Sequence, residues 1–243
     1  EPDQRELEAA VAALQAAKSP LIVAGGGVLY SGAEQTLLDF ARTHNIPVVE
    51  TQSGKGAMDW EEPLHFGSPG VTGTGCGNDL AAKADLVIGV GTRFQDFTTG
   101  SWTVFSHPDR RLLSINVHGY DAHKRAAQPL VGDAKVTLEK LSAALGGHRF
   151  QDPDFANRAK WFQTTDGVTS APKGNALPSD AQVVGAIQRT TGKDALVMSA
   201  SGSMPGVLHV LWRASQGGYH MEYGFSCMGY EIAGAMGIKM AKP

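Results

Sequence analysis

Short apolar runs of strand length alternate with stretches of helical periodicity through the first 147 residues. The runs at 20–24, 46–49, 85–91 and 111–117 are mostly apolar and end at Gly or polar residues, as strands buried on both faces do. Between them, residues 6–17, the segment after Ser31 and residues 133–145 carry apolar side chains at the spacing of one helix face. This alternation predicts an α/β fold: a doubly wound, Rossmann-like parallel sheet with helices on both faces.

The apolar density falls after residue 147, where Pro and Gly accumulate and only residues 155–162 could form a helix. We therefore expect a central domain over residues 1–147 and a linker over residues 148–178. Ser179 and Asp180 can cap a helix that reaches Thr190, residues 195–199 read as a strand, and residues 228–239 as a last helix. These signals predict that residues 179–243 are the incomplete start of a second α/β domain.

The composition is that of an ordinary globular chain: 243 residues, of which 42% are hydrophobic and 19% charged, with a formal net charge of −3. The sequence has no block of Lys and Arg that would mark a nucleic-acid-binding surface. It also has no run of about 18 apolar residues, the length that a membrane-spanning helix needs. Cys76 and Cys227 fit neither a disulfide framework nor a thiolate metal site. We expect a cytoplasmic protein with no nucleic-acid or membrane partner, whose natural start is missing because the sequence opens with Glu1.

Two glycine-containing turns could approach a ligand. Gly25, Gly26 and Gly27 follow a strand, but Tyr30 stands where the dinucleotide-binding fingerprint needs its third Gly. The turn is either a phosphate-binding loop or a tight strand-to-helix connection with Ser31 as the N-cap. In the second turn, Arg93 either contacts a ligand or pairs with a carboxylate such as Asp96.

Two features near the end of the sequence are candidates for chemistry. In the segment His220-Met221-Glu222-Tyr223, the two titratable side chains form an acid/base pair or lie in a solvated surface loop. Gly229, Ala233 and Gly237 recur every four residues, so one helix face permits close approach of another backbone or a flat ligand. Neither a His-Glu-x-x-His nor a Gly-x-Ser-x-Gly motif is present, which disfavours metal-hydrolase and serine-hydrolase chemistry.

Longer strings carry a resemblance to a known family. They are PLIVAGGG from Pro20, ETQSGKG from Glu50, GVTG from Gly70, DLVIGVGTR from Asp85, GSM from Gly202, GFSCMGY from Gly224 and AGAMG from Ala233. Their order resembles the central domain and the opening of the diphosphate-binding domain of thiamine-diphosphate enzymes such as acetohydroxyacid synthase. QDFTTGSW from Gln95 and GYHMEYGFSCMGYE from Gly218 resemble, within that superfamily, the trihydroxycyclohexane-1,2-dione hydrolases of inositol catabolism.

This resemblance implies a hydrolase that cleaves a carbon–carbon bond of a cyclic polyol-dione to give 5-deoxyglucuronate, with thiamine diphosphate as the electron sink. Carried over by position, the cofactor contacts are Gly202, Ser203, Met204, Cys227 and Met228, with Met228 under the bent cofactor. His220 and Glu222 are candidates for substrate contacts. The full-length enzyme is expected to be a homo-oligomer, a dimer or a tetramer.

The resemblance also implies that this chain lacks the cofactor-activating Glu and the Gly-Asp-Gly motif that holds Mg²⁺ in the family. We therefore expect neither thiamine diphosphate nor Mg²⁺ to bind to this chain alone, which would be inactive, and we assign no metal ligand or catalytic residue within it. Two alternatives stay open: a synthase or decarboxylase of the same superfamily, and a non-catalytic nucleotide-binding domain that uses the glycines at 25–27 and Arg93.

Overall fold

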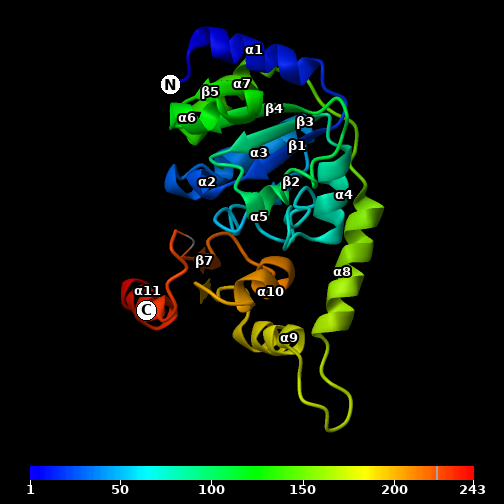
Figure 1. Cartoon of the computed structure of the whole chain (residues 1–243), viewed down its shortest axis with the longest axis vertical. Coiled ribbons are helices and arrows are strands. Elements are labelled where there is room, and N and C mark those ends of the chain that lie inside the picture. Colours follow the sequence, from blue (N-terminus) through cyan, green and yellow to red (C-terminus); the bar gives the residue numbers. More distant parts are fainter. Residues whose placement is uncertain (223) are drawn as a thin grey trace.

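A five-stranded parallel sheet forms the core of the larger, N-terminal part of the molecule, in the upper half of Figure 1. A computed structural model describes residues 1–222 and 224–243 of the chain. The strands lie in the order β2-β1-β3-β4-β5, and every neighbouring pair is parallel. Their bounds are β1 Pro20–Ala24, β2 Val48–Glu50, β3 Leu86–Val90, β4 Arg111–Asn116 and β5 Gln128–Val131.

Both faces of the sheet are buried, because successive side chains of a strand point to opposite faces. In β1, Ile22 and Ala24 belong to one apolar cluster and Leu21 and Val23 to another, and none of the four is more than 1% exposed. A strand that packs against apolar side chains on both faces has no face left for polar residues. This requirement explains the continuous apolar runs of the sequence and confirms the predicted doubly wound α/β fold.

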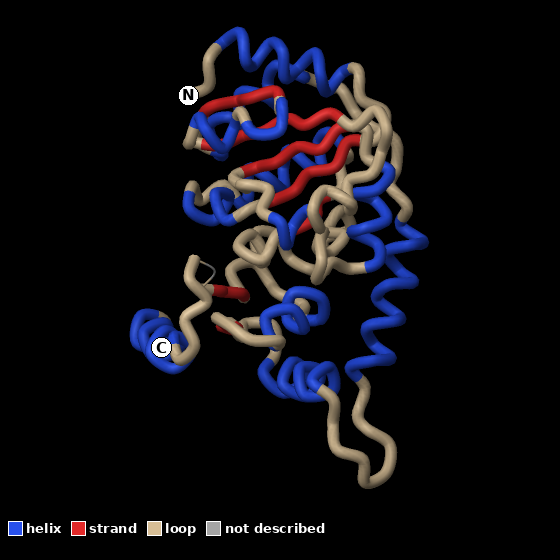
Figure 2. The backbone as a smooth tube through the Cα atoms, viewed as in Figure 1, coloured by secondary structure: helices blue, strands red, loops and turns tan. Residues whose placement is uncertain are grey.

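Helices supply the two outer layers (Figure 2). One face is covered by α1 Gln4–Gln15, α3 Glu34–His44 and α7 Ala134–Leu145. The opposite face packs against α4 Gly75–Lys83 and the loop that contains Phe105. Asp3 and Asp133 accept backbone hydrogen bonds at the starts of α1 and α7 and act as their N-caps. The short helices α5 Asp96–Thr99 and α6 Gly119–Ala122 and a 3₁₀ turn at Lys124–Ala126 lie in the loops after β3 and β4.

The predicted role of Ser31 as a helix N-cap is wrong. Residues Gly26–Tyr30 already form a short helix, α2, and Ser31 lies at its C-terminal end with its Oγ donating to the Gly27 carbonyl at 2.6 Å. The next helix, α3, begins after Ala33. A helix can start directly at the glycines because they lack the Cβ atoms that would strike the loop after β3.

The stretch predicted as a linker contains a longer helix than expected, α8 Phe155–Thr169. Arg158 fastens α8 to the central unit by donating to the carbonyls of Trp60, Glu62 and His65 at 2.7–3.0 Å. In Figure 1 α8 runs beside the sheet and leads to a long loop at the lower tip of the molecule. This loop, residues 171–178, has Leu177 at 92% exposure.

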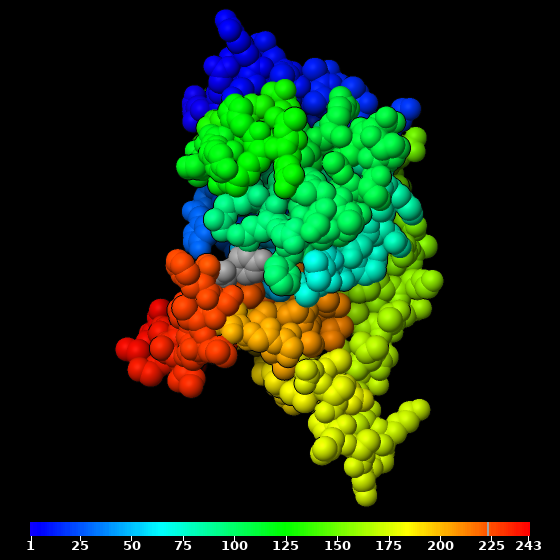
Figure 3. Space-filling view, viewed as in Figure 1, coloured from blue at the N-terminus to red at the C-terminus, as the bar shows by residue number. Residues whose placement is uncertain are grey.

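The remaining elements form a second, smaller unit. Its elements are α9 Asp180–Thr191, β6 Val197–Ser199, α10 Met204–Leu211, β7 Tyr219–Met221 and α11 Tyr230–Ala241. Strands β6 and β7 pair in parallel, and the unit has its own apolar cluster around Val184, Leu208 and Trp212. Ser179 caps α9 with the complete capping box that Gln182 supplies, as the sequence predicts for this helix start. Figure 3 shows α11 standing out from the body of the molecule.

None of the helices in the described ranges is both long and apolar enough to cross a membrane. The division into residues 1–147, 148–178 and 179–243 stays a prediction, which protease accessibility can test.

We expect trypsin to cut this chain first after Lys173. The backbone around Lys173 lies in an exposed loop, whereas α8 before it and α9 after it are packed together. Timed digestion followed by mass spectrometry would give two fragments that meet at Lys173, and Lys173→Gln should delay the first cut. Initial cleavage inside residues 20–117 would contradict the division.

Candidate functional site

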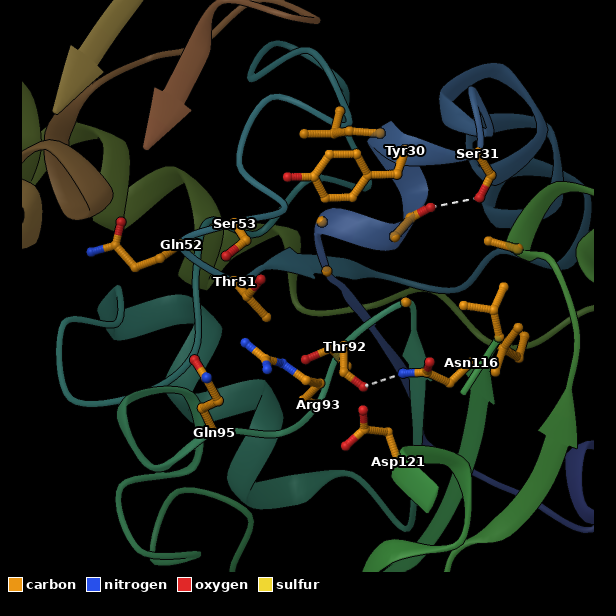
Figure 4. A pocket seen from close by; sticks show the side chains of 18 of the residues that line it. Tyr30, Ser31, Thr51, Gln52, Ser53, Thr92, Arg93, Gln95, Asn116 and Asp121 are labelled. Atoms are coloured by element: carbon orange, nitrogen blue, oxygen red, sulfur yellow. Dashed lines mark hydrogen bonds between the residues drawn. The ribbon is translucent and has the colours of Figure 1, made fainter. Parts of the chain in front are cut away.

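A cleft of about 740 Å³ lies at the carboxyl ends of the sheet strands (Figure 4). The loops after all five strands line it, as does β7 from the second unit. The strand order reverses between β1 and β3, and in open parallel sheets the crevice at such a reversal is the usual place for a ligand. Its lining includes Gly25, Gly26, Gly27, Tyr30, Thr51, Gln52, Ser53, Gly91, Thr92, Arg93, Asn116, Asp121, Tyr219 and His220.

The triple glycine of this cleft is packed tightly against the loop after β3. A Cβ atom on Gly25 would lie 2.4 Å from the Gly91 carbonyl oxygen, and one on Gly27 would lie 2.6 Å from Gly91 Cα. The Gly25 and Gly27 amides already donate to the Val90 and Gly91 carbonyls at 2.8 and 3.0 Å. Two amides that a phosphate would need are therefore engaged. Of the two interpretations of this turn, the geometry favours the tight connection.

Arg93 lies at the edge of the cleft, where Figure 4 shows it near Thr92 and Gln95. The pairing with Asp96 is not found among the ion pairs of the described residues, and the Asp96 carboxylate accepts from Ser101 Oγ at 3.0 Å. Arg93 also borders a smaller pocket of about 350 Å³ that contains Trp102 and Arg125. Its guanidinium is thus placed to meet a ligand in either space.

Beneath the cleft, the carboxylate of Glu50 is buried at the end of β2. It is 1% exposed and accepts hydrogen bonds from the amides of Met58 at 2.8 Å and Gly56 at 3.2 Å, and from the His65 ring at 3.1 Å. Burial alone would raise the pKa of Glu50. The His65 ring, the Lys55 ammonium and the Met58 amide outweigh burial and hold that pKa below its usual range.

Lys55 and His209 complete this buried group. Lys55 Nζ donates to the His209 carbonyl at 3.0 Å, and burial lowers the pKa of Lys55 to about 8. His209 Nε2 faces the Glu50 carbonyl at 3.0 Å, so this nitrogen carries the proton and Nδ1 accepts from Thr72 Oγ1 at 3.0 Å. Burial, with Lys55 nearby, lowers the pKa of His209 to about 3. The ring is therefore neutral.

These contacts join the second unit to the central sheet. Gln52, next to the group, donates to the Pro205 carbonyl at 3.1 Å and accepts from the Tyr219 hydroxyl at 2.8 Å. We call Glu50, Gln52, Lys55, His65 and His209 the buried junction. The buried junction was not predicted from the sequence, although Glu50, Gln52 and Lys55 lie within the ETQSGKG string. An ionisable residue directly after a predicted buried strand was a usable signal.

The predicted cofactor residues lie in two segments of the second unit. Gly202 and Ser203 precede α10, and Met204 is its first residue. Gly202 has φ +94°, and a Cβ there would meet nothing within 4 Å, so the start of α10 is open. Cys227 is exposed, and Met228, which directly precedes the N-cap Gly229 of α11, is 85% exposed. The structure brings the two segments together, because the amides of Ala200 and Gly229 both donate to Glu231 at 3.0 Å.

Of the two candidate substrate contacts, His220 lies within β7 and Glu222 directly follows it. His220 lines the cleft, and its Nε2 is 3.3 Å from the Tyr230 hydroxyl. Glu222 accepts from the amides of Phe225 at 3.1 Å and Cys227 at 2.8 Å, and these bonds hold the pKa of Glu222 below its usual range. No hydrogen bond joins His220 and Glu222 in the part of the chain that is described; Tyr223 lies outside it.

The expected stripe of small residues on the last helix needs correction. Gly229 is the N-cap of α11 and lies outside the helix, and a Cβ on Gly237 would meet nothing within 4 Å. The close approach occurs at Gly234, where a Cβ would lie 2.6 Å from the Met198 sulfur in β6. The spacing of small residues alone does not indicate which side of the helix faces the sheet.

Comparison with known families shows to which family the chain belongs. Residues 7–141 match the model described as "Thiamine pyrophosphate enzyme, central domain", and residues 200–243 match "Thiamine pyrophosphate enzyme, C-terminal TPP binding domain". The chain belongs to the thiamine pyrophosphate enzyme family. This confirms the resemblance inferred from the sequence strings.

Curated relatives in the thiamine pyrophosphate enzyme family cover nearly the whole chain. Proteins named 3D-(3,5/4)-trihydroxycyclohexane-1,2-dione hydrolase from Clostridium perfringens and Geobacillus thermodenitrificans are 39% and 40% identical to it over 99% and 100% of its length. The Bacillus subtilis protein of the same name is 35% identical over 100%. In each case the chain spans 42% of the relative's own length.

Two features of the described residues suit the family's cofactor. The open start of α10 offers backbone amides to a diphosphate, and the exposed Met228 side chain offers a deformable apolar surface to a ring. Within residues 1–222 and 224–243, no three His, Cys, Asp or Glu side chains gather in one place.

We expect His209 to make the chain sensitive to acid. Its pKa is lower in the folded state than in the unfolded state, so its contribution to stability is present above about pH 6.5 and is lost as the pH falls towards 3. Between pH 6.5 and 4.5, the free energy of unfolding of the wild type should fall by about 2 kcal/mol more than that of His209→Gln.

Urea titrations across this pH range would measure the difference. Gln can donate to the Glu50 carbonyl and accept from Thr72 without titrating, which makes it a suitable control. Parallel pH profiles for the two proteins would contradict a neutral, buried His209.

Proposed function

We propose that this chain is part of a thiamine-diphosphate-dependent hydrolase that opens the ring of a trihydroxycyclohexane-1,2-dione by cleaving a carbon–carbon bond. The observation that carries the proposal is the joining of the segments at 200–204 and 227–231 through Glu231. These are the two segments expected to face the cofactor. The shared name of relatives 35–40% identical to the chain supports the substrate class.

Each proposed cofactor contact has a defined task. The amides of Gly202, Ser203 and Met204 bind the diphosphate at the start of α10, where the helix dipole favours an anion. Met228, with Cys227 beside it, supports the rings from the loop before α11. When bound, thiamine diphosphate supplies the electron sink for carbon–carbon cleavage.

His220 is the stronger of the two proposed substrate contacts. Its ring lies on the cleft and is 3.3 Å from the Tyr230 hydroxyl, so it can present a polar nitrogen to a hydroxyl or carbonyl of a cyclic polyol. Glu222 is the weaker candidate, because both its oxygens already accept backbone hydrogen bonds. A contact from Glu222 to substrate would have to use the remaining lone pairs.

This chain spans 42% of its relatives' length. We propose that thiamine diphosphate is held with Mg²⁺ in the full-length protein, a homo-oligomer of the cytoplasm, and that this chain alone neither binds the pair nor turns over substrate. Helix-terminal amides supply only partial positive charge to a diphosphate that carries several negative charges.

A nucleotide-binding role is the second candidate. The cleft at the strand ends and the exposed Arg93 favour it. The engaged amides of Gly25 and Gly27, and Tyr30 in the third fingerprint position, weigh against a tightly bound FAD or NAD.

Thermal melts with and without ligands test these proposals. A ligand at 100 times its dissociation constant stabilises a protein by about 2.7 kcal/mol, which raises the melting temperature measurably. We expect thiamine diphosphate with Mg²⁺ to stabilise the full-length protein and to leave this chain unchanged, and FAD to stabilise neither.

Product analysis completes the test. The full-length protein should convert the cyclic dione to an open-chain acid and leave pyruvate unchanged. Turnover of pyruvate instead would favour the synthase or decarboxylase alternative. A melting shift with FAD but not with thiamine diphosphate would favour the nucleotide-binding role.

A further inference from the structure

The carboxylate of Glu231 joins two segments that are far apart in the sequence. Glu231, the second residue of α11, accepts from the Ala200 amide through Oε1 and from the Gly229 amide through Oε2, each at 3.0 Å. Hydrogen bonds from its own amide and from these two amides hold the pKa of Glu231 below its usual range. Both acceptor oxygens of an ionised side chain are thus committed to backbone groups.

The two amides mark the ends of functional segments. Ala200 is fully buried directly after β6 and leads to the open turn at Gly202. Gly229, with φ +92°, directly follows Met228 and precedes α11. The Glu231 carboxylate spans both amides and so links the turn at Gly202 directly to the loop with Met228. It acts together with the bond from the Glu222 amide to the Ser199 carbonyl at 3.1 Å and with the packing of Gly234 in α11 against Met198 in β6.

The loop with Met228 is also held at its other end. Glu222 accepts from Phe225 and Cys227, and Ser226 between them adopts a left-handed conformation with φ +51°. Two carboxylates therefore bracket a short loop that has few apolar contacts of its own. In contrast to the Glu222 carboxylate, the Glu231 carboxylate extends from α11 and also binds the amide of Ala200, the residue directly after β6.

We propose that Glu231 is a positioning residue, which sets the turn at 202–204 and the Met228 loop at the separation that thiamine diphosphate requires before the cofactor arrives. This inference rests on the proposed function. It assigns Glu231 no contact with substrate or cofactor. Its effect is exerted through the backbone of Ala200 and Gly229.

Charge alone predicts the opposite effect. A carboxylate near an anionic diphosphate disfavours binding, so a purely electrostatic role would make Glu231→Gln bind the cofactor more tightly. A positioning role makes the same variant bind more weakly, because the Gln amide has a single acceptor oxygen and must release one of the two backbone amides. The sign of the change separates the two explanations.

The first measurement needs no cofactor. Amide hydrogen exchange in the full-length protein should show Ala200 and Gly229 protected in the wild type, and at least one of them should exchange about tenfold faster in Glu231→Gln. Glu139→Gln is the matched control, since it makes the same charge change at an exposed position of α7. Unchanged exchange at both amides in Glu231→Gln would overturn the proposal.

The second measurement is the dissociation constant of thiamine diphosphate at saturating Mg²⁺, obtained by titration calorimetry on the same proteins. We expect binding to weaken about tenfold in Glu231→Gln, the fold-change of one hydrogen bond to a charged group, and to be unchanged in Glu139→Gln. Glu231→Asp keeps both acceptor oxygens and should recover part of the loss, which guards against a misfolded Gln variant.

The outcomes separate this inference from the proposed function. Equal or tighter binding by Glu231→Gln, with a wild type that binds, overturns the positioning role alone. A full-length wild type that does not bind thiamine diphosphate overturns the proposed function and this inference with it.

Discussion

The buried carboxylate of Glu50 is the interaction on which the rest of the structure depends. An ionised group that is 1% exposed is tolerated only when its oxygens are fully paired, and Glu50 meets this condition through two backbone amides, His65 and the nearby Lys55. Removing one partner of such a buried group costs about 3–5 kcal/mol, because the remaining charge stays in the interior. The loop after β2 therefore has little freedom to rearrange.

The rigid loop after β2 also holds the second unit. Lys55 and the Glu50 backbone carbonyl bind His209 in α10, and Gln52 binds Pro205 and Tyr219. The helix whose start faces the proposed cofactor is thus anchored near its start, at Pro205, and near its far end, at His209, to the strand ends of the central sheet. A sheet buried on both faces is a stiff support for such an anchor. The fold connects a site in one unit to a scaffold in the other.

Local patterns predicted the parts of this structure that local physics determines. Continuous apolar runs predicted β1, β2, β3, β4 and β6, and Ser179 with Asp180 predicted the start of α9, because these signals lie within a few residues. The short strands β5 and β7 were not predicted, because neither is a continuous apolar run. The start of the helix after β1 was misplaced because it depends on contact between Gly25 and Gly91, which are distant in sequence. The C-terminal half of α8 was missed because its partners are distant in the sequence: Arg213 donates to Thr165 and Asp166, and Arg189 donates to the Thr169 carbonyl.

The site was predictable only through resemblance. Nothing in the spacing of Glu50 and His209, 159 positions apart, indicates that they meet, and nothing in the local sequence indicates that Glu231 binds Ala200. Both contacts arise when the parallel strands bring their carboxyl ends, or the starts of the following helices, to one edge. The resemblance supplied the segments at 202–204 and 227–228, and the structure supplied the carboxylate that joins them.

The most direct test of the central role of Glu50 is the urea unfolding of Glu50→Gln followed by far-ultraviolet circular dichroism. The wild type should unfold in one cooperative transition, because the junction couples the two units. In Glu50→Gln the Lys55 ammonium loses its carboxylate, and the second unit should unfold first, in a separate transition at lower urea. A single transition at the wild-type midpoint would contradict the account.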